Sequence, residues 1–440
     1  MDLDLENRWV KMSTQLEWDE IEEKYKGLYC QDNGAPAKPV RMAIGALIIK
    51  QIEGLTDEKL VLHIQENPYM QYFCGFNEYT RELPFVPSLL VEFRKRYNDY
   101  VFWEINESTF RFKDPKNSEA GADLPNKGTL ILDLTCTPAN IKYPQDINLL
   151  NEAREKSEEI VEAMHEGNKG EKEKPRLDKK KAKQEYSKVA RSKKRNGKLM
   201  RKAIKKQLTY LARNLNYIDK LKADGHYDLL TDKQKEYLET IAKLYNQQKY
   251  MHENRVNRVD DRIVSIHQPH VRPIVRGKAA AKTEFGAVVA ASVVDGYAFV
   301  DNISWDAYNE SSDLIELVEY YRAVYGYYPE AVMVDKKYRT RENIDFCKAH
   351  GIRISGPRLG RPVKDTAAER EQAYKDSGIR NTIEGKFGIG KIAYGLRRVM
   401  AKLKETSETV IHLAFLAMNL VRMLFVYLSL FTNCQIGFAL

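Results

Sequence analysis

The sequence has few cysteines, and their number and spacing do not predict a zinc site, a thiol redox motif or a disulfide framework. Five occur among 440 residues, an odd number, at widely separated positions: Cys30, Cys74, Cys136, Cys347 and Cys434. No pair has the spacing of a zinc site or a thiol redox motif, and no disulfide framework is indicated. The N-terminal segment MDLDLENRW is acidic and lacks the apolar core of a secretory signal peptide. Both absences predict a protein of the reducing cytoplasm.

One long apolar run, Leu413 to Leu430, raises the question of a membrane span. Asn419 and Arg422 lie in its middle, and a polar amide and a charged guanidinium are both costly in lipid. The run is therefore interpreted as a buried helix that packs on the core, and no membrane partner is expected.

Positive charge is abundant but unevenly spread. The formal net charge is +9, and 440 residues are too many for one compact core, which indicates two or three domains. Between Gly167 and Asp224, 21 Lys and Arg stand against 6 Asp and Glu, a local net of +15, so the remainder of the chain carries −6. Such a zone suits a polyanion, most simply the phosphates of nucleic acid. The alternative is a solvated, highly charged helical arm.

Residues 1–112 are predicted to form an all-helical N-terminal domain. The segment RMAIGALIIKQIEGL has helical apolar spacing and ends at Gly54, and a second helix begins after Thr56, whose side chain can cap it. Pro68 breaks that pattern, and a basic helix is expected to start near Ser88. Such a domain can bind DNA or mediate dimerisation, and the pattern does not separate the two.

The middle of the chain is predicted to be a linker, a strand and a basic helical insertion. Residues 113–127 are rich in Pro, Gly, Ser and Asn, as linkers are, and the β-rich run GTLILDLTCT follows. Residues 146–261 are predicted to insert an antiparallel helical hairpin after this strand. Apolar residues recur there at coiled-coil spacing, namely Ile204, Leu208, Leu211, Leu215 and Ile218.

The remaining elements predict an α/β catalytic domain made of residues 128–145 and 262–440. A proline-broken basic loop over 262–278 contains His267 and His270, which are interpreted as packing or phosphate contacts. Two β-rich runs then meet at Asp295-Gly296, a tight-turn dipeptide. Helix, strand, helix and strand follow, and a last helix is expected from about Ala368 to Leu403. This order is that of a ribonuclease-H-like mixed sheet.

Two acids lie at or near the ends of predicted strands, and a third lies on the last predicted helix. Asp335 ends an apolar strand, Asp133 lies near the end of another, and Glu384 lies on the last helix in the segment RNTIEGKFGIGK. Arg380 and Lys391 share the helix face of Glu384. Each acid alone could be an ordinary solvated carboxylate or an exposed ion pair. Three glycines beside Glu384 weaken the helix, which favours close approach of a DNA backbone or of the sheet: Gly385, Gly388 and Gly390.

Asp133, Asp335 and Glu384 together form a set of hard oxygen donors that suits Mg²⁺ or Mn²⁺. Two such ions about 4 Å apart can activate a water or a 3′-hydroxyl and stabilise the leaving oxygen of a phosphodiester. Arg380 and Lys391 would then hold phosphates beside the metal ions.

These segments resemble those of the DDE transposases of bacterial insertion sequences. The resemblance covers LILDLTCTPANIKYPQD around Asp133, VDKKYRTREN around Asp335 and the Arg-x₃-Glu-x₆-Lys helix, and the N-terminal segment through FCGF is also similar. Many members of that family carry a tyrosine where this sequence has Ser377. The resemblance implies a cytoplasmic, nucleoid-associated bacterial enzyme. It would form a homodimer on DNA, bind terminal inverted repeats and join 3′-hydroxyls to target DNA.

Several residues are candidate DNA contacts, and Trp305 could stack on a flipped base or pack in the core. The full set is Arg380, Lys391, Lys337, Arg339, Arg272, Arg276, Lys278 and Trp305. Two other functions stay open. One is a catalytically inactive DNA-binding protein derived from a transposase, which the intact acids disfavour. The other is a nuclease on the same fold without strand transfer.

Overall fold

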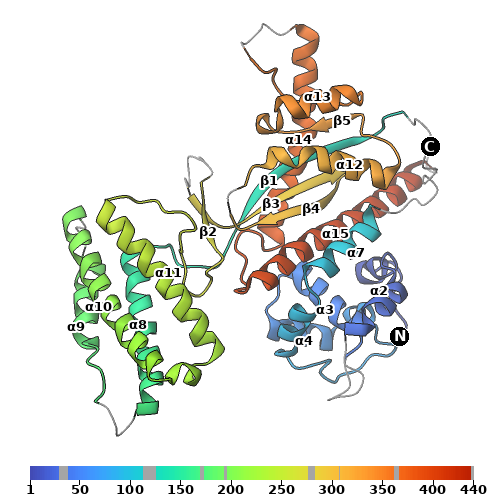
Figure 1. Ribbon diagram of the computed structural model, residues 1–440. Helices are drawn as coiled ribbons and strands as arrows, with labels where there is room; N and C mark the ends of the chain where they lie inside the picture. The colour runs from blue at the N-terminus through green and yellow to red at the C-terminus, as the bar shows by residue number, and fades with distance from the viewer. Residues whose placement is uncertain are drawn as a thin grey trace. The chain divides into compact units, whose positions relative to one another are not determined.

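The computed structural model of the chain describes residues 1–28, 38–111, 125–168, 173–192, 196–275, 283–306, 308–360 and 366–437, with side chains through Tyr427 in the last helix. The described residues fall into two compact units (Figure 1). The first comprises Met1–Pro138, Val288–Ser304 and Tyr308–Leu440, and the second comprises Ala139–Ala287 and Trp305–Ala307. Most of the predicted linker, together with Arg276 and Lys278, lies outside the described residues.

The first unit begins with the predicted helices. Gly54, with φ of 63°, ends one helix, and the Thr56 side chain accepts the backbone N–H of Lys59 at the start of the next. Pro68 occupies the first turn of a further helix, where its missing N–H costs nothing, so it starts a helix as well as ending one. The helices are α1 (Arg8–Ser13), α2 (Trp18–Tyr25), α3 (Val40–Glu53), α4 (Asp57–Glu66), α5 (Pro68–Phe73), α6 (Leu89–Arg96) and α7 (Asp99–Phe110).

A mixed sheet follows in the first unit, which confirms the α/β class. Its strand order is β4-β3-β1-β5-β6, with parallel pairing of β1 to β5 and of β5 to β6, and antiparallel pairing of β3 to β4. The β3–β4 turn is at Asp295-Gly296, as predicted, with positive φ at both residues. The strands are β1 (Thr129–Pro138), β3 (Thr283–Val294), β4 (Tyr297–Ser304), β5 (Ala331–Met333) and β6 (Arg353–Ile354).

The first unit also contains four further α-helices: α12 (Leu314–Tyr325), α13 (Arg341–Ala349), α14 (Ala367–Ala393) and α15 (Lys404–Gly437). The predicted extension of α14 to Leu403 is wrong. The helix ends because the backbone N–H groups of Tyr394 and Leu396 both bond to the carbonyl of Gly390, and Gly395 takes a left-handed conformation. Leu396 is then buried beneath the helix end, at 1% exposure.

Helix α15 packs on the core, as predicted for the apolar run, and lies beside α7 and β4 (Figure 1). Its residues Lys404–Tyr427 are apolar and long enough to cross a membrane, but 61% of their most apolar window is buried within the structure. The buried Asn419 side chain donates to the Ala298 carbonyl at 2.7 Å and to Asn106 Oδ1 at 2.9 Å, and it accepts the Ala298 N–H at 2.9 Å. A polar residue of the apolar run thereby attaches α15 to the sheet.

A second buried polar contact joins the end of α7 to the sheet. Arg111 donates through Nη2 to Ser292 Oγ at 2.9 Å and pairs through Nε with Glu107 at 3.0 Å. Its guanidinium lies 3.9 Å from the ring centre of Phe299. Asp301 accepts from Ser292, and burial raises the pKa of this carboxyl to about 7. The N-terminal helices and the sheet therefore share one core.

The second unit is a helical bundle with a short strand pair. Its helices are α8 (Asp146–His165), α9 (Lys179–Ala190), α10 (Gly197–Ala223) and α11 (Asp232–Asn254). Of the predicted apolar seam of α10, Leu208, Leu211 and Ile218 are buried in the bundle core, and Ile204 and Leu215 are partly buried against it. Helices α8 and α9 also pack in this bundle, so it contains more than the predicted two-helix hairpin. The predicted loop over 262–278 contains strand β2 (Arg272–Val275), which forms because it pairs with Thr283–Gly286.

Replacement of Asn419 by leucine tests the attachment of α15 to β4. We expect Asn419→Leu to lower the free energy of unfolding by about 1–3 kcal/mol, because Ala298 and Asn106 lose their buried hydrogen-bond partner. Urea titration followed by circular dichroism measures this loss. Asn257→Leu, at an exposed position, is the control and should stay near the wild type. Equal stability of the two variants would show that these hydrogen bonds do not hold α15 in place.

Candidate active site

Parallel strand pairing places the first two acids at neighbouring positions. The register of β1 and β5 aligns Thr129 with Ala331 and Ile131 with Met333. Asp133 and Asp335 each lie two residues beyond the last of these pairs. Because parallel strands run side by side about 4.8 Å apart, both carboxylates reach the same edge of the sheet.

The two aspartates differ in environment. Asp133 lies within β1, is half-buried, and accepts the backbone N–H of Leu134 at 2.8 Å. Asp335 follows β5 and caps the short 3-10 helix η6 (Lys336–Tyr338), where its Oδ1 accepts the N–H of Lys336 at 2.5 Å. Its side chain is 46% exposed. One acid is thus held in the sheet, while the other faces solvent at a strand end.

Helix α14 brings the third acid and an arginine to this edge. The helix packs against both β1 and β5, and a capping box at Thr366 and Glu369 fixes its start. The Arg380 guanidinium lies 3.1 Å from Glu384 Oε1 and 3.7 Å from Asp335 Oδ1. Arg380 therefore bridges the helix acid and the strand-end acid, and all four residues predicted for this centre are brought together.

The charges of two of the carboxylates change the pKa of the third. Burial raises the pKa of Asp133 above its ordinary value, and the negative charges of Asp335 and Glu384 raise it further. The N–H of Leu134 and the guanidinium of Arg380 lower the pKa of the same group. Arg380 thus offsets part of the repulsion among three acids at one edge of the sheet.

The donor set fits a hard divalent cation in its chemistry, since all three groups are carboxylates. Within the described part of the chain, no group of three or more His, Cys, Asp or Glu residues has the geometry to hold a metal ion. The Arg380 guanidinium supplies the positive charge among the acids in this arrangement. A divalent cation that uses all three acids therefore requires the carboxylates to converge and Arg380 to move aside.

The predicted basic contacts beside Asp335 are already engaged with protein groups. Lys337 Nζ lies 3.0 Å from Oε1 of Glu310, a buried acid that the sequence pattern did not single out. Arg339 donates through Nη1 to the carbonyls of Ile354 and Ser355, at 2.9 and 2.8 Å. DNA contact by Lys337 and Arg339 stays a prediction, and it requires these side chains to exchange partners. Lys391 lies two turns beyond Glu384 and is partly exposed.

Two further candidates belong to the second unit. Arg272 Nε lies 3.5 Å from Asp306, and its Nη1 donates to the carbonyl of Val271 at 3.2 Å. Trp305 is 6% exposed and packs edge-on against His270, with ring centres 4.4 Å apart. Its indole thus lies in a core environment here, and base stacking by Trp305 stays a prediction.

The histidines of the 262–278 segment are engaged in packing contacts. His267 bonds to the Tyr237 hydroxyl and to Glu152 Oε1, each at 2.8 Å. His270 packs against Trp305, as described above. Both observations agree with the packing interpretation of this pair and leave phosphate contact untested.

The glycines of α14 differ in their surroundings. A Cβ added at Gly390 would lie 2.8 Å from Leu396 Cδ1, so this glycine admits a protein side chain. At Gly385 and Gly388, an added Cβ would meet no atom within 4 Å. No described part of the protein therefore lies close enough to require glycine at these two positions, which lie beside Glu384.

Two segments of the chain match known families. Residues 332–421, which contain Asp335, Arg380, Glu384 and Lys391, match the model described as "Transposase DDE domain". Residues 2–96 match the model described as "Transposase domain (DUF772)". Both descriptions indicate a transposase, and the resemblance to DDE transposases is confirmed.

One curated relative adds a weaker similarity. A Rhizobium meliloti protein titled "Uncharacterized protein ORF8 in nfe locus" is 28% identical over 141 residues, which are 32% of this chain. The chain spans 66% of that relative's length, just under two thirds. No solved structure matches the chain.

Neutralisation of Asp133 tests the repulsion among the acids. The raised pKa means that the ionised carboxylate is less favourable in the folded chain than in the unfolded one. We expect Asp133→Asn to be more stable than the wild type at pH 7. The gain should shrink as the pH falls toward 3.8, the ordinary pKa, below which both folded and unfolded chains are protonated.

Urea unfolding of both proteins between pH 3.5 and 8 measures this difference. Asp345→Asn, at an exposed position on α13, is the matched control and should show no such gain. A variant Asp133→Asn that is less stable than the wild type at pH 7 would contradict the account of the charge environment.

Proposed function

We propose that this DDE transposase binds the ends of its own mobile element, cuts DNA strands there and transfers them into target DNA. The observation that carries the proposal is that Asp133, Asp335 and Glu384, from two neighbouring strands and one helix, lie at one edge of the sheet and interact electrostatically with one another and with Arg380. Three carboxylates that repel one another bring no evident gain in the stability of the fold. A role in phosphodiester chemistry explains why they lie together.

The fold supports a ribonuclease-H-like assignment for the catalytic core. The strand order β4-β3-β1-β5-β6 combines the antiparallel hairpin β3–β4 with three parallel strands, β1, β5 and β6, and α13 connects β5 to β6. Ligands of such α/β sheets bind at the carboxyl ends of parallel strands. Asp133 and Asp335 lie toward that edge, where a bound phosphate would meet them.

The three acids would hold one or two Mg²⁺ or Mn²⁺ ions. Such ions would supply Lewis-acid stabilisation of the phosphodiester oxygens and a deprotonated water or 3′-hydroxyl. The chain's own contribution is to position these acids through the paired strands and through α14. Arg380, once released from Asp335 and Glu384, would bind a DNA phosphate at the same edge, and Lys391 would bind another on the same helix face.

The remaining assignments follow from this activity. The substrate is double-stranded DNA, comprising terminal inverted repeats and target, and the active form is a homodimer assembled on two ends. The helices of residues 2–96 would bind DNA or mediate the dimer. The enzyme would act in the bacterial cytoplasm at the nucleoid. A nuclease without strand transfer is the second candidate, because the same acids would hydrolyse a phosphodiester.

Substitution of single acids tests the catalytic assignment. We expect Asp335→Asn and Glu384→Gln each to abolish strand cleavage of duplexes that carry the DNA flanking the gene. DNA binding should be largely retained, since each change removes a negative charge. Gel analysis of end-labelled DNA with Mg²⁺ measures cleavage. Glu371→Gln, an exposed acid on the same helix, is the control and should cleave normally. Normal cleavage by either site variant would refute the assignment.

Gly388 offers a test in which stability and activity move in opposite directions. Gly388→Ala adds a methyl group into open space and improves helix propensity, so the free energy of unfolding should rise by up to about 1 kcal/mol. If a DNA backbone lies close to the helix surface at Gly388, the same methyl group should slow cleavage. Cleavage at the wild-type rate would show that DNA does not approach the helix closely at Gly388. Glu371→Ala, on the same helix, controls for altered helix propensity.

A further inference from the structure

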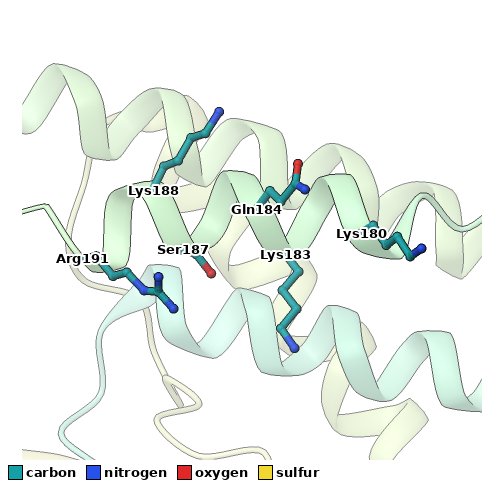
Figure 2. Close-up of a pocket in the computed structure, with 6 residues that line it drawn as sticks. All are labelled: Lys180, Lys183, Gln184, Ser187, Lys188 and Arg191. Carbon is teal, nitrogen blue, oxygen red and sulfur yellow. The ribbon is translucent and has the colours of Figure 1, made fainter.

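Helix α9 of the second unit presents a face made of cations and small polar groups. Lys180, Lys183, Gln184, Ser187, Lys188 and Arg191 line a shallow hollow on this helix (Figure 2). At 100° per residue, these six positions fall within about 140° of the helix circumference. No acidic or large apolar side chain is among them, so the face is uniformly basic and polar.

The orientation of this face is fixed by the opposite side of the helix. Ala182 and Val189 are buried, at 0% and 7% exposure, and lie on the side turned away from the hollow. Glu185, at the flank, is engaged by Lys206 Nζ at 2.6 Å and by the Tyr210 hydroxyl at 3.0 Å on α10. The packed side holds α9 in place, and the cations must therefore point outward.

Neighbouring cations of the same unit are paired with acids, but those of the hollow are not. Lys174 and Lys179 both pair with Glu162, and Arg213 pairs with Asp178. Within the described residues, the side chains of Lys180, Lys183, Lys188 and Arg191 form no ion pair or hydrogen bond. Four unneutralised cations on one rigid helix repel one another, and a polyanion would relieve that repulsion.

We propose that this α9 face, Lys180 to Arg191, binds the sugar-phosphate backbone of duplex DNA. The inference rests on the proposed transposase function and adds a contact surface outside the candidate active site. From Lys180 to Arg191 the helix rises about 16 Å, a length over which duplex DNA presents several phosphates. Gln184 and Ser187 lie between the cations and can donate hydrogen bonds to phosphate oxygens. Because the face has no apolar anchor, an acidic backbone suits it better than a protein partner.

Neutralisation of the four cations in the full-length chain tests the proposal. The variant K180Q/K183Q/K188Q/R191Q keeps good helix formers at all four positions. Its binding to a random-sequence 30-base-pair duplex is measured by fluorescence anisotropy between 50 and 300 mM KCl. We expect weaker binding and a slope of log Kobs against log [KCl] reduced by up to about 4, since each lost phosphate contact removes about 0.9.

A matched variant removes the same charge elsewhere. K233Q/K249Q/K348Q/K404Q neutralises four exposed lysines on other elements, none of them assigned to DNA contact, and it should keep the wild-type slope. The charge-retaining variant K180R/K183R/K188R/R191K should also bind as the wild type does, which separates loss of charge from loss of folding. A slope equal to that of the matched control in the α9 variant would overturn the proposal.

Failure of this inference can be told apart from failure of the proposed function. If the wild type binds duplex DNA and the α9 variant binds equally well, only the α9 assignment is wrong. If the wild type binds no duplex at any salt concentration, the proposed function and the α9 assignment both fail.

Discussion

Mutual repulsion of three carboxylates at one sheet edge is the constraint on which the rest of the structure depends. Asp133 and Asp335 lie there because β1 and β5 pair in parallel register, and Glu384 joins them because α14 packs across both strands. Arg380 lies between the helix acid and the strand-end acid and offsets part of the repulsion. Such an arrangement persists only if the surrounding fold is rigid enough to hold it.

That rigidity comes from buried contacts beneath the sheet. Asn419 of α15 and Asn106 of α7 bond to the same backbone group of β4, and Arg111 bonds to Ser292 of β3. These contacts bring the N-terminal helices, the sheet and the last long helix into one core. The two segments that match transposase families are thus parts of a single compact unit, although about 235 residues separate them, by the numbering of the two matches.

Features governed by neighbouring residues were predictable from the sequence. The Asp295-Gly296 turn, the Gly54 helix end and the Thr56 cap follow from local backbone preferences, and Asp335 was found because an apolar strand stops just before it. Asp133 lies within β1, which continues to Pro138. Features governed by distant contacts were not predictable. Helix α14 ends early because Leu396 folds beneath Gly390. Strand β2 forms because of its pairing partner. The engagement of Arg339 by carbonyls of a neighbouring strand has no sequence signal at all.

Asp133, Asp335 and Glu384 are proposed to act together as one cation-binding centre. Electron paramagnetic resonance can measure the binding of Mn²⁺ to the full-length chain in the presence of duplex DNA. We expect the wild type to bind Mn²⁺ and Asp133→Asn, Asp335→Asn and Glu384→Gln each to weaken binding at least tenfold. Wild-type affinity in any one of the three variants would contradict a shared centre.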